Sequence, residues 1–483
     1  MSSLIKNELS KIFHKKAIYI VLIIILGFTV LNSILEKVFS NSDFIANIDK
    51  ESVKASLEMV DKNNPADKEQ YISLSAQLQA IELAEKYDKN SWQNFIIKRD
   101  AQSIIERMIR YEGTEDYEYS KEKYDEFIEK LEKDDWKTFA NSELETAEYE
   151  LSQADKNGGA DDNSLETVRD SKKALEWRLE KDIPYGNNSK SKIIENWIAN
   201  KGLYRDLLEQ EKTKKLSYDE KMKKQEAEAN IKLYEYAIEN NVSNKAEDKM
   251  LNTQTAIATT ADTRLVETNY EYSMFITIAV VIIAGTIVSE ESNKGTIKLL
   301  LVRPYKRTKI LFAKFISCLI TLLLTLIATT LIQFVVGGFT YGFNNYLGNI
   351  IIYNFSKGNI ETISTFAYLL ITTLAILPQI LLLSTLAFTI STVFNSSPIA
   401  IAIPLLGGTV AGIINQLFLF YKQAEFLKFF VTPNWDLRIY LFGKLPMYEG
   451  LNLGFSIVIC LIYFIVLLTL STVVFKKRDI KNV

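Results

Sequence analysis

The chain has 483 residues, 48% of them hydrophobic and 24% charged, and its formal net charge at pH 7 is −3. His14 is the only histidine, so the sequence excludes a zinc site built from several histidines. The two cysteines, Cys318 and Cys460, both lie in hydrophobic segments. The sequence contains no Gly-x-x-x-x-Gly-Lys-Ser/Thr motif, so we expect this chain not to bind ATP through a P-loop.

The first hydrophobic segment, residues 17–35, contains no charged side chain and approaches the ~20 residues needed to cross a bilayer. A charge at the bilayer centre costs roughly 2.5–3.5 kcal/mol on insertion, so such runs are unusual in soluble proteins. Five later segments meet the same test: residues 272–289, 315–336, 366–393, 398–420 and 453–475. The sequence therefore predicts six membrane spans.

A cleaved signal peptide is the alternative interpretation of residues 17–35. The run is longer than the ~7–15-residue core of a signal peptide, and no small-x-small cleavage site follows it. We therefore expect this segment to stay attached as an anchor. The later topology would be the same in either case.

Basic residues predict the orientation, because they concentrate on the cytoplasmic side of a membrane. They cluster before span one, between spans two and three, and after span six. With six spans, all three clusters and both termini face the cytoplasm, and residues 36–271 lie outside the membrane on the other side. The abundance of Lys, Asn and Ile is typical of a bacterium of low GC content, so we expect a bacterial plasma membrane.

Residues 36–271 show the spacing of amphipathic helices, as in Tyr71, Leu74, Leu78 and Ile81. We predict an all-α membrane protein with six transmembrane helices and a large helical extracytoplasmic domain, either a bundle or a long hairpin. Its last helix is expected to run from near Asn244 directly into span two. Such a domain would gather or shield a substrate, contact an envelope partner, or serve as a solvated spacer.

Residues 290–314 form the loop between spans two and three. Residues 296–302 are long enough for about two helical turns, and Pro304 disfavours continuation of that helix. The sequence predicts a short apolar helix with a basic edge at the cytoplasmic mouth of the two spans. An interfacial helix resting on anionic headgroups is the simplest physical interpretation.

This loop resembles the coupling loop of type-2 ABC exporter permeases, in the subgroup with a large extracytoplasmic domain between spans one and two. Residues 1–16 resemble the amphipathic connecting helix of these permeases, and residues 475–480 resemble their usual tail. The resemblance covers residues 1–35 and roughly 272–483. The loop positions that it marks as ATPase-coupling are Glu290, Glu291, Gly295, Thr296, Ile297, Leu299, Leu300, Arg303, Pro304 and Arg307.

The resemblance implies a transport subunit that is not itself an enzyme. Two separate ABC ATPase subunits would bind ATP and Mg, and a second permease copy or homologue would complete the dimer in the lipid membrane. Ile297, Leu299 and Leu300 would contact the ATPase. The charged loop residues would fix the loop or pair across the interface. We expect no catalytic residue, directly bound cofactor, metal or nucleic-acid partner in this chain.

The resemblance further implies export of an amphipathic or hydrophobic substrate, such as an antimicrobial peptide or a lipid-like compound. Sodium is an alternative substrate, although the spans contain no carboxylate to bind it. A mechanotransmitting or sensor protein, which moves its outer domain without transporting a solute, is the alternative function.

Overall fold

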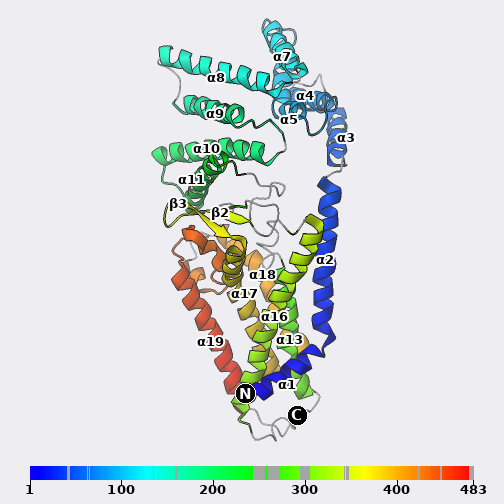
Figure 1. The fold of residues 1–483 in the computed structure, drawn as a ribbon, viewed down its shortest axis with the longest axis vertical. Coiled ribbons are helices and arrows are strands. Elements are labelled where there is room, and N and C mark those ends of the chain that lie inside the picture. Colours follow the sequence, from blue (N-terminus) through cyan, green and yellow to red (C-terminus); the bar gives the residue numbers. More distant parts are fainter. Residues whose placement is uncertain are drawn as a thin grey trace. The chain divides into compact units, whose positions relative to one another are not determined.

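A computed structural model describes most of the chain, which divides into two compact units. Unit one contains Met1–Leu35, Ser217–Gln225 and Leu251–Val483, and unit two contains Glu36–Leu216 and Glu226–Met250. Figure 1 shows the fold and labels its elements where there is room. The described residues are 1–40, 44–61, 64, 66–133, 135–157, 162–186, 188–242, 256–258, 272–293, 305–341, 343, 348–420, 425–446 and 449–477.

Unit one is mainly helical. Its helices are α1 (Ser2–Phe13), α2 (Lys16–Ser40, which continues past the unit boundary), α13 (Ser273–Thr286), α14 (Ser289–Asn293), α16 (Arg307–Tyr341), α17 (Thr365–Phe394), α18 (Ser397–Phe420) and α19 (Leu453–Lys477). Within the described ranges, five segments are long and apolar enough to cross a membrane: Lys16–Leu35, Ser273–Asn293, Arg307–Thr340, Thr365–Phe394 and Leu453–Lys477. The prediction of a helical protein with several spans is therefore confirmed. A sixth span at α18 stays a prediction, because its described apolar part, Ser397–Ala411, is shorter.

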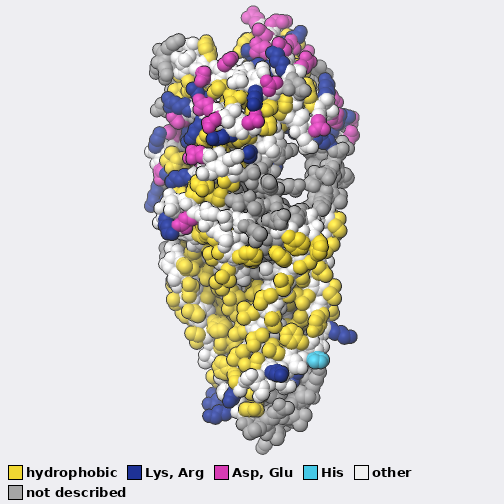
Figure 2. Space-filling view, in the orientation of Figure 1, with side chains coloured by type: hydrophobic (Ala, Val, Ile, Leu, Met, Phe, Trp, Pro, Cys, Tyr) yellow, Lys and Arg dark blue, Asp and Glu magenta, His cyan; other side chains and the backbone are white. Residues whose placement is uncertain are grey.

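Helix α17 lies at the centre of unit one and packs against α13, α18 and α19. Val281, Ile283 and Ala284 of α13 meet Phe388 of α17 in a fully buried core. In contrast, α2 and α19 expose many isoleucine, leucine and valine side chains, and Figure 2 shows hydrophobic side chains over this unit. These exposed apolar faces suit a lipid environment, in which helices satisfy all their backbone hydrogen bonds internally.

A small antiparallel sheet in unit one adds to the predicted helical fold. Its strand order is β1 (Ala256–Ala258), β2 (Asn349–Asn354), β3 (Asn359–Ser364), with Ile257 opposite Ile351 and Ile351 opposite Thr362. The prediction of a continuous helix from near Asn244 into span two is wrong, because strand β1 lies in that stretch. Backbone pairing with β2 holds residues 256–258 extended.

The connection between α18 and α19 contains two short 3-10 helices, η3 (Glu425–Phe429) and η4 (Leu437–Gly443). Asn434 lies between them and is fully buried. Its amide donates to the carbonyl oxygens of Lys428 and Phe430 at 2.7 and 2.6 Å, and its Oδ1 accepts from Ser456 Oγ of α19 at 2.6 Å. These bonds fold the connection onto the start of α19.

Unit two consists of helices over the residues that the structure describes, as predicted for this region. They are α3 (Phe44–Glu58), α4 (Lys68–Ala84), α5 (Trp92–Ile96), the π-helix η1 (Ile97–Ala101), α6 (Gln102–Arg110), α7 (Tyr117–Glu132), α8 (Trp136–Asn157), α9 (Asp162–Glu180), α10 (Ser189–Thr213) and α11 (Tyr218–Glu239, from residue 226). Consecutive helices pack together, as α8 does on α9 and α9 on α10. Ser91 and Asn188 cap α5 and α10 by accepting from backbone N–H groups.

Candidate functional site

Helix α1 has one buried face, which packs against α16. Leu4, Glu8 and Ile12 are buried at intervals of four residues, whereas Lys6 is exposed. Ile12 joins Leu311 and the other apolar residues of the unit-one core. This spacing is the period of an amphipathic helix, and it carries the carboxylate of Glu8 into the same buried face as two apolar side chains.

Four charged side chains from three helices form a closed set of ion pairs, which we call the four-residue ring: Glu8 and Lys11 of α1, Glu291 of α14 and Lys314 of α16. Lys314 Nζ lies 2.8 Å from Glu8 Oε2 and 2.7 Å from Glu291 Oε2. Lys11 Nζ lies 2.9 Å from Glu8 Oε1 and 2.7 Å from Glu291 Oε1. Each carboxylate therefore uses both oxygens, and each ammonium contacts both carboxylates.

Much of the four-residue ring is buried, so the charges of its members have to balance. Lys314 is 1% exposed and Glu8 is 3% exposed, whereas the Lys11 side chain is 42% exposed. Lys314 also donates to the backbone oxygen of Ile287 at 3.2 Å. The two positive and two negative charges of the ring balance one another. Such pairing offsets the cost of burying charged groups away from water.

The surroundings shift the pKa of both α1 members of the ring. Burial by itself raises the pKa of Glu8, but the charge and hydrogen bond of Lys314 outweigh burial and the pKa is lowered. Burial lowers the pKa of Lys11, but its hydrogen bonds to Glu291 and Glu8 outweigh this effect and the pKa is raised. Both side chains are therefore charged at neutral pH.

A second set of contacts holds the end of span two. Lys15 Nζ lies 3.1 Å from Glu290 Oε2 and donates to Thr286 Oγ1 at 2.7 Å. Ser289 N donates to Ser391 Oγ of α17 at 3.1 Å, and the hydroxyl groups of Ser289 and Ser397 are 2.7 Å apart. The beginning of the loop is thus fixed to α1, α16, α17 and α18.

The structure describes three of the coupling residues predicted from the sequence. Glu291 contacts Lys11 of α1, and Glu290 pairs with Lys15 in the connection between α1 and α2. Arg307 at the start of α16 donates to the backbone oxygen of Lys476 at 3.2 Å. Both flanks of the loop are therefore attached to other helices of unit one. The other predicted coupling residues lie outside the described residues: Gly295, Thr296, Ile297, Leu299, Leu300, Arg303 and Pro304.

The loop motif predicts a role for Glu291, whereas no motif assigns a specific role to Glu8 or Lys11. Two features of the sequence could have pointed to the ring. Glu8 is the only acidic residue among the lysines that precede span one, and Lys314 interrupts an apolar run. A lone charge in an apolar segment requires a partner, because burying it unpaired is costly.

Comparisons with known proteins agree with membrane location and give no activity. A family model described as a protein of unknown function (DUF2705) matches residues 244–481. The uncharacterized protein YhcI of Bacillus subtilis is 34% identical over 202 residues, 42% of this chain and 64% of YhcI. The uncharacterized membrane protein YdbK of the same organism is 25% identical over 205 residues, 42% of this chain and 76% of YdbK.

The aligned part thus spans less than two thirds of YhcI. No solved structure matches the chain significantly. The five apolar helices and the similarity to a membrane protein together define the class of this chain, a multi-pass membrane protein.

Proposed function

We propose that the chain is the transmembrane permease subunit of an ATP-driven ABC exporter. The observation that carries the proposal is the attachment of the loop between the second and third spans. Glu291 at one flank joins Glu8 and Lys314 in the four-residue ring, and Arg307 at the other flank binds the end of α19. A loop fixed at both flanks can transmit displacement to several helices at once, as a coupling loop must.

The proposed topology has six spans, with α18 as the fifth of them. The three basic clusters then face the cytoplasm together with both termini, and unit two lies outside the cell. The bacterial plasma membrane is the proposed location. The relatives from Bacillus subtilis support a bacterial setting.

Two ABC ATPase subunits would supply the energy, with a second permease copy or homologue completing the dimer. The sequence supports this division, because it has no P-loop and its spans contain no carboxylate for an ion-driven cycle. ATP and Mg would bind in the partner chains. The proposed substrate is amphipathic or hydrophobic, an antimicrobial peptide or a lipid-like compound, with sodium as the alternative.

The test is purification of the chain from its native membrane in mild detergent, followed by mass spectrometry and an ATPase assay. We expect co-purification of an ATPase with a P-loop. The Leu300→Asp variant should lose the ATPase, because a carboxylate would enter the apolar face expected to contact it. Leu300→Ile is the matched control and should retain the ATPase.

Two outcomes would count against the proposal. In the first, the well-folded wild-type chain is recovered without any ATPase. In the second, Leu300→Asp retains ATPase association and normal coupling of hydrolysis to transport. The amount of each variant in the membrane fraction separates a coupling defect from failure to insert.

The alternative of a mechanotransmitting or sensor protein would be favoured by a rigid helix running from the outer domain into span two. Strand β1 occupies part of that connection instead. Transport of a solute into or out of membrane vesicles, measured with the ATPase present, distinguishes the two functions.

A further inference from the structure

Unit two contains a cavity of about 640 Å³ between helices α6, α7, α8 and α9. Pockets of roughly 300–1,000 Å³ are typical of sites for small ligands. Phe127 of α7, Phe139 of α8 and Leu175 of α9 line it and are themselves largely buried. The cavity therefore offers an apolar surface within a unit whose exterior is rich in charged side chains (Figure 2).

A network of buried charges holds one wall of this cavity in place. The Arg178 guanidinium is 2% exposed, bonds to Glu195 and lies 4.3 Å from the centre of the Tyr185 ring. The Tyr185 hydroxyl donates to Glu143, and Glu143 also pairs with Arg99 at 2.6 Å. Burial and the charge of Glu143 raise the pKa of Tyr185, so this hydroxyl stays protonated and keeps donating.

Other charged side chains line the cavity and take no part in that network. In the part of unit two that the structure describes, the side chains of Arg107 on α6 and Glu150 on α8 make no hydrogen bond or ion pair with the protein. Lys130 lies one turn after Glu126 on α7, and Glu126 pairs with Lys123 at 2.8 Å. Arg107 and Glu150 are exposed and Lys130 is half-buried, so their charged groups are accessible to a ligand.

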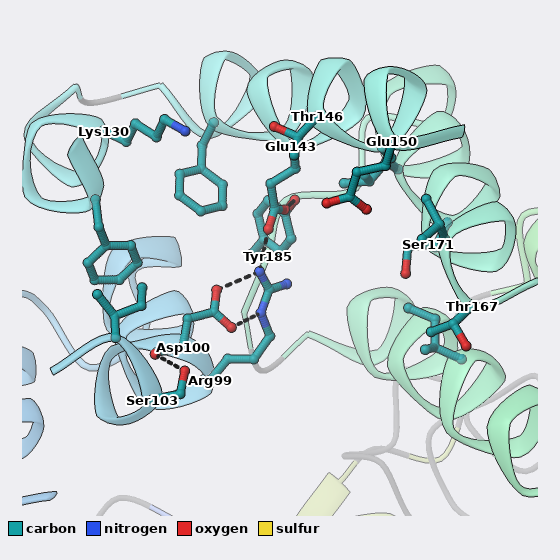
Figure 3. Close-up of a pocket in the computed structure, with 18 of the residues that line it drawn as sticks. Arg99, Asp100, Ser103, Lys130, Glu143, Thr146, Glu150, Thr167, Ser171 and Tyr185 are labelled. Carbon is teal, nitrogen blue, oxygen red and sulfur yellow. Dashed lines mark hydrogen bonds and ion pairs between the residues drawn. The ribbon is translucent and has the colours of Figure 1, made fainter. Parts of the chain in front are cut away.

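Of these three accessible side chains, the two basic ones and the acidic one lie on different helices. Arg107 and Lys130 belong to α6 and α7, whereas Glu150 belongs to α8. Figure 3 shows Lys130 and Glu150 on either side of Tyr185, with the carboxylate of Glu150 directed toward the cavity. A ligand that satisfies both sides must carry an anionic group and a cationic group at its two ends, with apolar groups between them. A single amino acid has both charges on one carbon and cannot meet this requirement.

We propose that this cavity binds a short peptide with free termini. Its carboxylate would pair with Arg107 and Lys130, its ammonium group with Glu150, and its apolar side chains would lie over Phe127 and Phe139. Arginine suits the carboxylate because its planar guanidinium can donate two parallel hydrogen bonds. An extended tripeptide spans about 10 Å, a length appropriate for reaching across a cavity of this size.

The test is isothermal titration of the full chain, purified in lipid nanodiscs, with the tripeptide leucyl-phenylalanyl-leucine. We expect the free tripeptide to bind and its N-acetylated and C-amidated forms each to bind about tenfold more weakly. This loss corresponds to one charge-assisted contact. In Glu150→Gln the free and N-acetylated peptides should bind equally, while the C-amidated peptide remains weaker. In Arg107→Gln the effect of C-amidation should shrink instead.

Matched control variants come from the same helices. Glu145→Gln on α8 and Lys121→Gln on α7 change exposed charges that do not line the cavity, and they should bind as the wild type does. Tryptophan fluorescence during thermal unfolding checks that each variant is folded. If a variant is unfolded, the three forms of the peptide still test both ends of the site on the wild type.

Absence of binding by the free tripeptide at millimolar concentration would overturn the inference. So would equal affinity for the three forms on the wild type, or an unchanged preference in folded Glu150→Gln. The measurement needs no ATPase, so its outcome is independent of the proposed function.

Discussion

Replacing Glu8 by Gln tests whether the four-residue ring stabilises unit one. The change keeps the size of the side chain and removes one carboxylate, so Lys314 retains only Glu291 as a charged partner. Breaking a fully buried ion pair costs about 3–5 kcal/mol. The remaining pair at 2.7 Å lowers this cost, and the half-exposed Lys11 contributes less than about 1 kcal/mol. We expect a loss of about 2–3 kcal/mol.

Cys318 provides the assay, because it lies one turn after Lys314 in α16 and is buried in the core that α1 covers. Its labelling by a maleimide under native conditions requires local opening. When opening and closing are fast, the labelling rate follows the population of the open form. A loss of 2–3 kcal/mol then corresponds to labelling that is roughly 30- to 150-fold faster. A Cys460→Ser background removes the second thiol.

Lys6→Gln is the control, because Lys6 is exposed on the same helix. It should label at the wild-type rate. Equal labelling rates in Glu8→Gln and Lys6→Gln would refute the stabilising role of the ring. A double variant with Lys314→Met adds a second criterion. Its effect should be smaller than the sum of the two single effects, because it no longer leaves a buried ammonium short of a partner.

Three further measurements test the ring by pH and two contacts elsewhere in unit one. The melting temperature of the wild type should exceed that of Glu8→Gln by a constant amount above about pH 5. This difference should disappear as the pH falls through the pKa of Glu8, which Lys314 lowers in spite of burial, since glutamine does not titrate. Gly443→Ala should cost about 1–3 kcal/mol in thermal unfolding, because Gly443 has φ +81° and an added Cβ would lie 2.7 Å from Ser356 N. Asn434→Leu should cost about 2–3 kcal/mol by the same measurement, because it leaves buried polar groups without their partners. Unchanged melting temperatures in either variant would contradict these packing arguments.

The helices of the membrane-spanning unit could be predicted from the sequence because one physical rule dominates there. A run without charges and of bilayer length has few alternatives to a membrane helix. The sheet was missed although β2 contains Ile350, Ile351 and Ile352 in succession, a pattern typical of a buried strand. The error at β1 has another origin. Residues 256–258 are Ala-Ile-Ala, for which pairing with a strand about 95 residues later overrides helix propensity.

In the candidate site, too, some residues could be predicted from the sequence and others could not. Glu290, Glu291 and Arg307 belong to a contiguous motif, so the sequence alone could single them out. The partnership of Glu8 with Lys314 joins positions 306 residues apart. Local spacing carries no information about such a pair, and only the folded arrangement of α1 and α16 brings the two side chains together.

The separation between Glu8 and Lys314 also has a consequence for biogenesis. A ribosome adds about 5–20 residues per second, so the 306 residues between them take roughly 15–60 s to synthesise. During that interval α1 has no Lys314 to neutralise Glu8, and burial of this face would be costly. Helix α1 therefore has to wait in an aqueous or interfacial setting until the third span has been inserted. Completion of the ring then marks the moment when α1 docks onto a helix that is synthesised much later.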